Sequence, residues 1–439
     1  MSLVEMANRH TTQASRPGGT AVLRRAPFSD NPRVGARGQR TQQRILDAAL
    51  QVFADAGYHR GSVDRITKVG GCSRVSFYQY FSSKEDVFRH LAEQVSRQVS
   101  ASTEALDPLT PDRDGWAVMR AWVARYAGIY ARYEPVFNSY QVAAESEEFL
   151  ASLAARTGEE SVTRIHTRLE RPTLAPRQLD AVIRLLLECL AHTLDVAGIL
   201  RSVAPGEYPS ERVTDAIADV LHRTMFGARA GVNVRPYDGA PPPALRARSS
   251  MLELALDDAT TAPSGALAAL LTSGRDVFVR RGFHATRVDD LVVAAGVSHG
   301  AFYRHFRNKE ELARILTAGA LRAVGTALVE IPDLDVGATA LRRWLRRSHE
   351  AQAKEAAMMR VWVDAALQDP ALRADFAAPL DWGRRRLSRY LRQREFGDVD
   401  MDAVVMVALL GVLGARPRPA ADIDAAAHVV QRGLLGCTS

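Results

Sequence analysis

The sequence has few cysteines and no long uninterrupted apolar segment. Only three of its 439 residues are cysteines, Cys72, Cys189 and Cys437. Three scattered cysteines are too few for a disulfide framework or a zinc site, so a reducing cytoplasm is expected. No apolar run reaches a membrane-spanning length without a charge, and residues 1–40 lack the apolar segment of a signal peptide. We therefore expect neither a membrane span nor export.

The motifs of common enzyme classes are missing as well. The chain contains no Walker loop and no G-x-G-x-x-G after a strand. Its carboxylates are scattered along helical patterns, and its 11 histidines show no spacing typical of metal ligands. An enzyme is therefore disfavoured, and neither a metal nor a cofactor is expected.

Positive charge is concentrated at the start of the chain. The formal net charge is +7, and residues 1–40 hold seven Arg against Glu5 and Asp30. A basic arm beside a folded module attracts a phosphate backbone, but a disordered basic tail can also serve solubility alone. The charge pattern by itself gives these two interpretations equal weight.

A sequence repeat dominates the organisation of the chain. Residues 73–81 read SRVSFYQYF and residues 298–306 read SHGAFYRHF. When residues 44–88 are aligned with 269–313 without a gap, 14 of 45 positions are identical. Weaker similarity continues between 119–126 and 341–348 and between 179–187 and 401–409. The whole chain therefore consists of two copies of one unit.

The repeat and the composition predict six segments. The Pro- and Gly-rich stretch 228–263 has the composition of a linker. The expected segments are a disordered basic arm at 1–40, a helix-turn-helix domain at 41–88, a helical ligand and dimerisation domain at 89–227, the linker at 228–263, a second helix-turn-helix domain at 264–313 and a second ligand and dimerisation domain at 314–436.

Each helix-turn-helix is predicted from apolar spacing and cap residues. Apolar positions recur at helical spacing up to Gly57, where a left-handed cap is expected. Ser62 can cap a second helix, Gly70-Gly71 breaks the chain, and Ser73 can cap a short third helix. That third helix is the expected recognition helix, with Phe77 and Phe81 toward the core.

The residues expected to contact DNA lie on and around the two recognition helices. Gln can bind adenine, Arg can bind guanine or phosphate, and a lysine at a helix start can bind phosphate. In the first head the expected contacts are Ser62, Ser73, Arg74, Val75, Ser76, Tyr78, Gln79, Tyr80 and Lys84, and in the second they are Thr286, Arg287, Ser298, His299, Gly300, Ala301, Tyr303, Arg304, His305 and Lys309.

At these residues the sequence resembles the TetR/AcrR family of bacterial transcriptional regulators. The segment GFHATRVDDLVVAAGVSHGAFYRHFRNKEEL at 282–312 is a near-complete match to the family pattern. The first copy departs more, because Gly61 stands for the family Thr and the turn reads GGCS. The resemblance implies an all-α fold with two tandem units, each a three-helix DNA-binding domain followed by a helical ligand and dimerisation domain.

The resemblance also implies how the units work. The last two long helices of each unit, at 179–200 with 210–226 and at 401–414 with 421–435, should join the copies into an intramolecular pseudo-dimer. The partners are then double-stranded DNA, as an asymmetric operator, and an apolar or acyl inducer. Tandem chains of this type resemble actinobacterial repressors of mammalian-cell-entry (mce) lipid-transport operons, which implies control of lipid or sterol genes.

A ligand pocket is expected in the first unit, although an aromatic stripe is more often plain core. The residues expected to line it are Trp122, Tyr126, Tyr130, Phe137, Tyr140 and Leu186. Two alternatives stay open: higher oligomers on one operator, and an interaction module that kept the duplicated fold without binding DNA.

Overall fold

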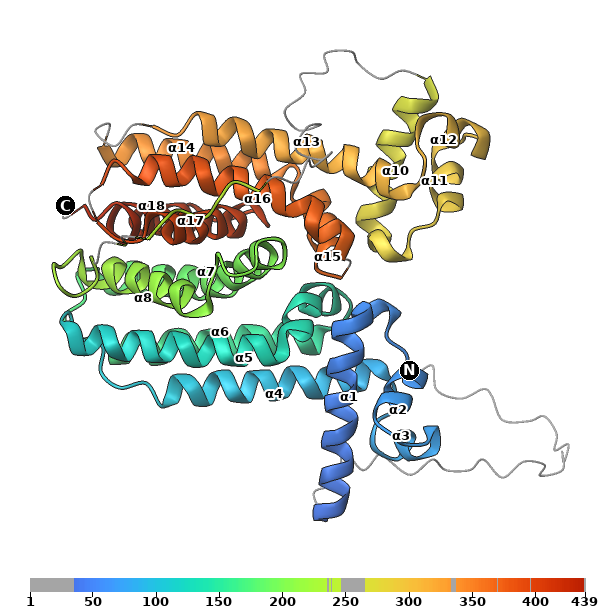
Figure 1. Ribbon diagram of the computed structural model, residues 1–439, viewed down its shortest axis with the longest axis horizontal. Coiled ribbons are helices and arrows are strands. Elements are labelled where there is room, and N and C mark those ends of the chain that lie inside the picture. The colour runs from blue at the N-terminus through green and yellow to red at the C-terminus, as the bar shows by residue number, and fades with distance from the viewer. Residues whose placement is uncertain are drawn as a thin grey trace, which may run out of the picture.

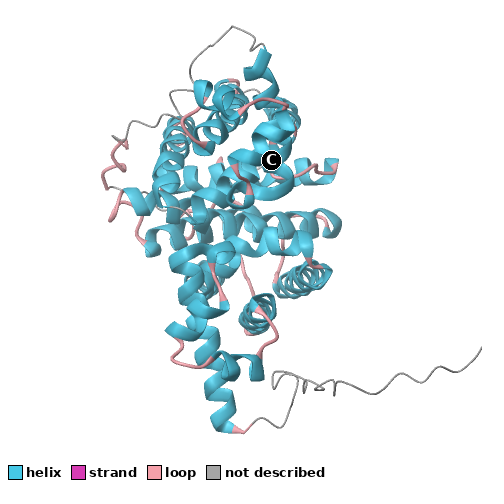
Figure 2. Ribbon diagram, turned by 90° about the vertical axis from the view of Figure 1, so that its right-hand side faces the viewer, coloured by secondary structure: helices cyan, strands magenta, loops and turns pink. Residues whose placement is uncertain are grey.

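The computed structural model describes residues 35–234, 237, 239–245, 265–332, 337–368, 370–394 and 396–437. These residues form helices joined by short loops, and their only β pairing is an isolated parallel bridge between Leu109 and Leu169 (Figure 2). The expected all-α fold is confirmed. Most of the expected basic arm (1–34) and much of the expected linker (246–263) lie outside the described residues.

The helices follow the same order in both halves of the chain. The first half contains α1 (Ala36–Arg60), α2 (Val63–Val69), α3 (Arg74–Tyr80), α4 (Lys84–Glu104), α5 (Arg113–Ser146), α6 (Glu148–Arg168), α7 (Pro176–Val203) and α8 (Ser210–Phe226). The second half contains α10 (Gly265–Ala285), α11 (Val288–Ala295), α12 (His299–His305), α13 (Lys309–Val329), α14 (Gly337–Ala353), α15 (Ala356–Gln368), α16 (Pro370–Leu391), α17 (Val399–Gly414), α18 (Ala420–His428) and the π-helical η3 (Val429–Leu434). Because α1 begins at Ala36, the last residues of the expected arm are helical.

Glycines set the turns of both DNA-binding heads, which are α1–α3 and α10–α12. Gly57 has φ 74° and ψ 158°, and the matched Gly282 has φ 74° and ψ 166°. The expected left-handed cap at Gly57 is therefore corrected, because a positive φ with an extended ψ is a conformation open essentially to glycine alone. Gly296 ends α11 in the left-handed helical region, with φ 65° and ψ 32°. Gly71, the matched residue, also has a positive φ of 56°.

Serine and asparagine side chains cap helix starts in both heads, at Ser62 and Ser73 as the sequence predicts. The hydroxyls of Ser62, Ser73 and Ser83 accept hydrogen bonds of 3.3, 3.0 and 3.2 Å from backbone N–H groups three residues later. In the second half Ser298 and Asn308 accept equivalent bonds of 3.2 and 2.9 Å. Each cap satisfies a backbone donor that the helix itself leaves free.

Three apolar cores hold the molecule together. One lies in each head, and each of them continues into the helices beneath the head. The third is shared by the two halves, because buried residues of α5, α7 and α8 and of α14, α17 and α18 belong to one cluster. The apolar helix α13 is long enough to cross a membrane by length and composition alone, but it packs against α10, α14, α15 and α16. Those contacts account for its apolar character.

The two halves pack side by side with both heads at one end of the molecule (Figure 1). Helix α7 packs against α16, α17 and α18, and α8 packs against α17 and η3. Two ion pairs cross this contact: Arg223 with Asp402 at 2.8 Å is buried, and Arg212 with Asp398 at 2.5 Å is half-buried. The helices expected to join the copies are therefore the ones that meet.

Candidate nucleic-acid interface

The recognition helix of the first head separates core residues from exposed ones. Phe77 is fully buried beneath α3. Arg74 and Gln79 are exposed, as are Val75 and Tyr78, with 73% and 45% of their surface accessible. An exposed valine on a helix that fits the major groove can contact a thymine methyl group, and glutamine can bind adenine. This face can therefore contact base edges.

The recognition helix of the second head has the same buried phenylalanine as the first but a different set of exposed residues. Phe302 is fully buried beneath α12, as Phe77 is beneath α3. The exposed residues are His299, Gly300, Tyr303, Arg304 and His305. This face carries more donors that bind phosphate or guanine than the first face does.

Four expected contact residues are wholly or partly turned toward the protein, and the expectations for the two buried ones are corrected. Tyr80 was expected to face outward, but only 9% of its surface is accessible because it belongs to the core of the first head. Thr286 is 1% accessible, and its hydroxyl donates to the carbonyl of Gly282 at 2.7 Å. Ser76 and the matched Ala301 are half-buried.

The two lysines expected to bind phosphate are used inside the heads. Lys84 Nζ donates to the carbonyl of Tyr58 at 3.1 Å and lies 4.4 Å from the centroid of its ring. Lys309 Nζ donates to the carbonyls of Phe283 and Thr286, both at 2.8 Å. Burial lowers the pKa of both lysines. Each ammonium group therefore ties the start of one helix to the end of α1 or α10, and the expected phosphate contact stays a prediction.

The remaining expected residues lie at the helix starts near the exposed faces. Ser62, Ser73 and Ser298 are exposed, but their hydroxyls accept the capping hydrogen bonds described above. Arg287 is also exposed and precedes α11, and its backbone N–H donates to Asp290 at 2.9 Å. Its side chain can therefore contact a phosphate.

Two matched aspartates are functional candidates that the sequence pattern did not single out. Asp64 of α2 forms an ion pair with Arg74, with 2.5 Å between Oδ1 and Nε, and Asp289 of α11 lies 2.6 Å from Nε2 of His299. The repeat held a signal for this contact, because the two aspartates are identical at aligned positions.

A matched pair of histidines connects the two heads. The ring centroids of His59 and His284 lie 6.2 Å apart, across the contact between the halves. Burial, together with the nearby Lys84, lowers the pKa of His59. The two heads therefore come close to each other at these imidazole rings, near the ends of α1 and α10.

The first unit encloses a small apolar cavity of about 20 Å³. Trp122 and Leu186 line it as expected, together with Met119, Ile165, Leu221 and other apolar residues. The indole N–H of Trp122 is buried and has no hydrogen-bond partner among the residues that the structure describes. A cavity of this size holds about one water molecule.

The other four expected pocket residues do not line this cavity. Three of them form a row of aromatic contacts that starts at Trp122. The ring centroids lie 6.3 Å apart for Trp122 and Tyr126, 6.2 Å apart for Tyr126 and Phe137, and 5.0 Å apart for Phe137 and Tyr130. Tyr140 packs against the core of the first head, and its hydroxyl donates to a backbone carbonyl of α6 at 2.6 Å. Burial raises the pKa of Tyr140 to about 12. The aromatic stripe therefore connects the cavity with the head.

Comparison with known families identifies the two heads. The profile for bacterial regulatory proteins of the tetR family matches residues 45–91 and 270–315. The first match covers the end of α1 through the start of α4, and the second covers the corresponding part of the second half. Both matches include the recognition helix described above.

Similarity to one curated protein extends beyond a head. The chain is 30% identical over 192 residues to the HTH-type transcriptional repressor Rv1474c of Mycobacterium tuberculosis, a match that covers 42% of this chain and 92% of that protein. It is 37% identical over 83 residues to the HTH-type transcriptional activator FasR of Mycolicibacterium smegmatis, covering 19% of this chain and 36% of FasR. It is 40% identical over 50 residues to the fatty acid metabolism regulator protein of Bacillus subtilis, covering 11% of this chain and 26% of that protein.

Proposed function

The chain belongs to the tetR family of bacterial regulatory proteins, and from this premise we propose that one chain binds one asymmetric operator through two non-identical heads. Members of this family bind DNA and regulate transcription, so the chain is a DNA-binding regulator and not an enzyme. The observation that carries the asymmetry is the difference between the exposed faces of α3 and α12. Two identical heads would require identical half-sites, whereas these two heads do not.

The proposal treats the two halves of one chain as the two members of a pseudo-dimer. The shared apolar core and the ion pairs between the halves support it. The half-sites should lie roughly one helical turn apart, about 34–36 Å. The basic arm before α1 is proposed to reach a neighbouring minor groove.

A small apolar or acyl molecule is proposed to control DNA binding through the first unit. Support comes from the apolar cavity at Trp122, whose indole N–H is available to a ligand acceptor. The cavity must open to admit such a molecule, and Phe137 contacts both the shared core and the core of the first head. A ligand that binds the opened form would shift the population toward a head arrangement that no longer fits the operator.

The proposal also includes the target genes: the chain represses lipid transport or lipid metabolism genes, including an mce operon. One relative is named as a repressor and another as a fatty acid metabolism regulator. The second similarity is confined to 50 residues, so it supports the lipid target less than the first supports repression. Regulation of such genes would take place in the cytoplasm.

The test is a footprint of the purified chain on the DNA upstream of its own gene, with titration of the number of chains bound. We expect one asymmetric protected site occupied by one chain. Two double variants, Tyr78→Ala with Gln79→Ala and Tyr303→Ala with Arg304→Ala, should each abolish protection of a different half-site. Both pairs are exposed on their recognition helices, so both variants should fold.

Other outcomes would contradict parts of the proposal. A palindromic site that requires two chains would mean that chains pair between molecules or that one head does not contact DNA. Absence of protection on this and neighbouring promoters would favour an interaction module that kept the duplicated fold. Footprints with and without long-chain acyl compounds test the ligand, and unchanged protection would reject an acyl inducer.

A further inference from the structure

In both heads an aspartate of the second helix holds the first residue of the recognition helix. Asp64 binds Arg74 through two contacts, Oδ1 with Nε at 2.5 Å and Oδ2 with Nη2 at 2.8 Å. In the second head Oδ1 of Asp289 lies 2.6 Å from Nε2 of His299. Asp64 and Asp289 occupy matched positions of the repeat, and so do Arg74 and His299. The same aspartate contact therefore occurs in both heads, and its partner is an arginine in one and a histidine in the other.

These pairs are too exposed to serve mainly as stabilising contacts. The side chains of Arg74 and Asp64 are 62% and 64% accessible, and those of His299 and Asp289 are 56% and 74% accessible. Ion pairs exposed to this degree contribute little to stability because water and salt screen them. What each pair does determine is the orientation of a side chain at the tip of a recognition helix.

The contacts leave a different hydrogen-bonding edge free in each head. The carboxylate of Asp64 occupies the Nε–Nη2 edge of Arg74, so the edge that includes Nη1 points away from the pair. In the second head Nε2 of His299 faces the carboxylate of Asp289. In the tautomer that carries its proton on Nε2, the ring donates to this carboxylate and leaves Nδ1 as an acceptor.

We propose that Asp64 and Asp289 determine the base specificity of the two heads by fixing which edge of Arg74 and of His299 faces the DNA. The inference rests on the proposed function, since it requires that both heads contact an operator. The free donors of Arg74 match the O6 and N7 acceptors of guanine. The free acceptor of His299 matches the amino group of cytosine or adenine. At this position the two heads therefore select opposite kinds of base edge.

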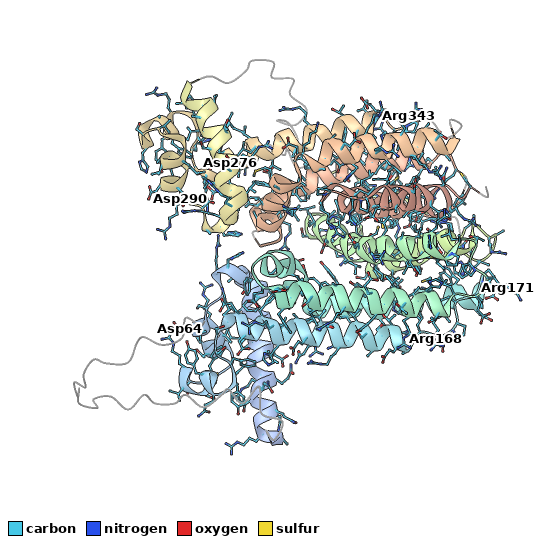
Figure 3. The ribbon with its side chains drawn as sticks, turned by 180° about the vertical axis from the view of Figure 1, so that it is seen from behind. Asp64, Arg168, Arg171, Asp276, Asp290 and Arg343 are labelled. Atoms are coloured by element: carbon cyan, nitrogen blue, oxygen red, sulfur yellow. The ribbon has the colours of Figure 1, made fainter. Side chains whose placement is uncertain are left out.

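Figure 3 shows Asp64 in the first head, with Asp290, the neighbour of Asp289, in the second head at the same end of the molecule. Two other exposed aspartates provide charge-matched controls on the first helix of each head. These are Asp55 on α1 and Asp276 on α10, the latter also labelled in Figure 3. Changing either one removes the same charge without touching Arg74 or His299.

The experiment measures binding of the full chain to operators in which each base pair is substituted in turn. The variants are Asp64→Asn, Asp289→Asn and the controls Asp55→Asn and Asp276→Asn. We expect Asp64→Asn to reduce discrimination at one base pair of the first half-site by about tenfold, the scale of one well-formed base contact. Asp289→Asn should act on one base pair of the other half-site, and the controls should keep the wild-type profile.

A substitution in the recognition helix gives an independent test. Arg74→His should move the preference of the first head from guanine toward the base selected by the second head, because Asp64 would then hold an imidazole. An unchanged guanine preference in this variant would overturn the inference.

Failure of the inference can be told apart from failure of the proposed function. If the wild-type chain discriminates between operators and the Asp64→Asn and Asp289→Asn variants keep its base preferences, the inference is overturned and the proposed function stands. The inference is also overturned if affinity rises equally for all sequences, because the aspartates would then only repel phosphate. If the wild-type chain shows no sequence preference at all, both proposals fail.

Discussion

The first head exposes Arg74, Val75 and Gln79 on α3, whereas the second exposes His299, Gly300 and Arg304 at the matched positions of α12. The residues beneath these faces are the same, since Phe77 and Phe302 are both fully buried. The buried phenylalanines are thus retained in both recognition helices, whereas the exposed residues at these three matched positions differ. The two copies share a scaffold and differ in the surface that the scaffold presents.

A second difference lies at the contact between the halves. Asp402 of α17 is 1% accessible and pairs with Arg223 and Arg394, whereas the matched Asp180 of α7 is 45% accessible and pairs with His166 at 2.6 Å. One repeated aspartate has therefore become a buried interface charge in one copy and a surface charge in the other. Sequence identity within a repeat does not guarantee equal energetic importance.

Removing the two matched aspartates should give the largest contrast. Asp402→Asn leaves the buried guanidinium groups of Arg223 and Arg394 without their shared carboxylate, so we expect the free energy of unfolding to fall by about 3–5 kcal/mol. Asp180→Asn should change it by less than about 0.5 kcal/mol, as is usual at exposed sites. Urea denaturation measures both values, and equal effects would show that the buried pairing does not hold the halves together.

Exchanging one residue between the exposed faces of α3 and α12 tests how each face contributes to DNA binding. Arg304→Gln should weaken operator binding and make the salt dependence of log K shallower by about one unit, and Gln79→Arg should make it steeper by a similar amount. Arg343→Gln is the control, since Arg343 lies at the far end of the molecule from the heads (Figure 3). If Arg343→Gln changes the slope of log K against log salt as much as Arg304→Gln does, the prediction that α12 contacts DNA is contradicted.

The matched tryptophans should differ by one hydrogen bond. The indole N–H of Trp344 donates to the carbonyl of Ala327 at 2.7 Å, whereas that of Trp122 has no partner among the described residues. Trp344→Phe should therefore destabilise the protein by about 1 kcal/mol more than Trp122→Phe. The comparison uses denaturant unfolding without ligand, and an equal loss would reveal a hydrogen-bond partner for Trp122 in solution.

The smallest contrast is a pH effect confined to the first head. Hydrogen bonding to Asp86 raises the pKa of His90, and for Asp86 the hydrogen bonds from His90 and Ser82 outweigh burial and lower its pKa to about 2. The contribution of His90 is full below its unfolded pKa of about 6.5 and is lost as the pH rises through its folded pKa. The contribution of Asp86 is present above its unfolded pKa and is lost as the pH falls toward 2.

In the second head Ile315 occupies the position of His90, so His90→Ile copies that head. We expect the variant to have a lower thermal midpoint than the wild type near pH 5, by about 1–3 °C, and the gap to narrow as the pH rises toward 9. A gap that widens with pH would have the wrong sign for a histidine stabilised in its charged form.

Much of the fold was predictable because its signals are local. The caps at Ser62 and Ser73, the break at Gly71 and the buried Phe77 all follow from spacing along one or two helical turns. The repeat then doubled every such signal and supplied the family resemblance. The exposed positions Val75 and Gln79 were predicted correctly for the same reason.

The errors share a physical cause. Tyr80 was expected at the surface because it stands in a recognition helix, and Thr286 because it precedes α11. Both side chains are instead committed to partners within the heads. The pocket was predicted from an aromatic stripe of α5, yet only Trp122 and Leu186 of that set line the cavity. Helical periodicity predicts a face and cannot predict what packs against it.

The sequence alone therefore determined the all-α class, the duplication, the turns and the two different recognition faces, since these depend on residues close together in the chain. Only the tertiary structure decided which charges are buried between the halves, which lysines bind carbonyls and which aspartates orient Arg74 and His299. Those outcomes depend on side chains from separate helices meeting within hydrogen-bond distance. The physical reason is that burial and pairing are properties of the assembled surfaces, and a linear pattern does not contain them.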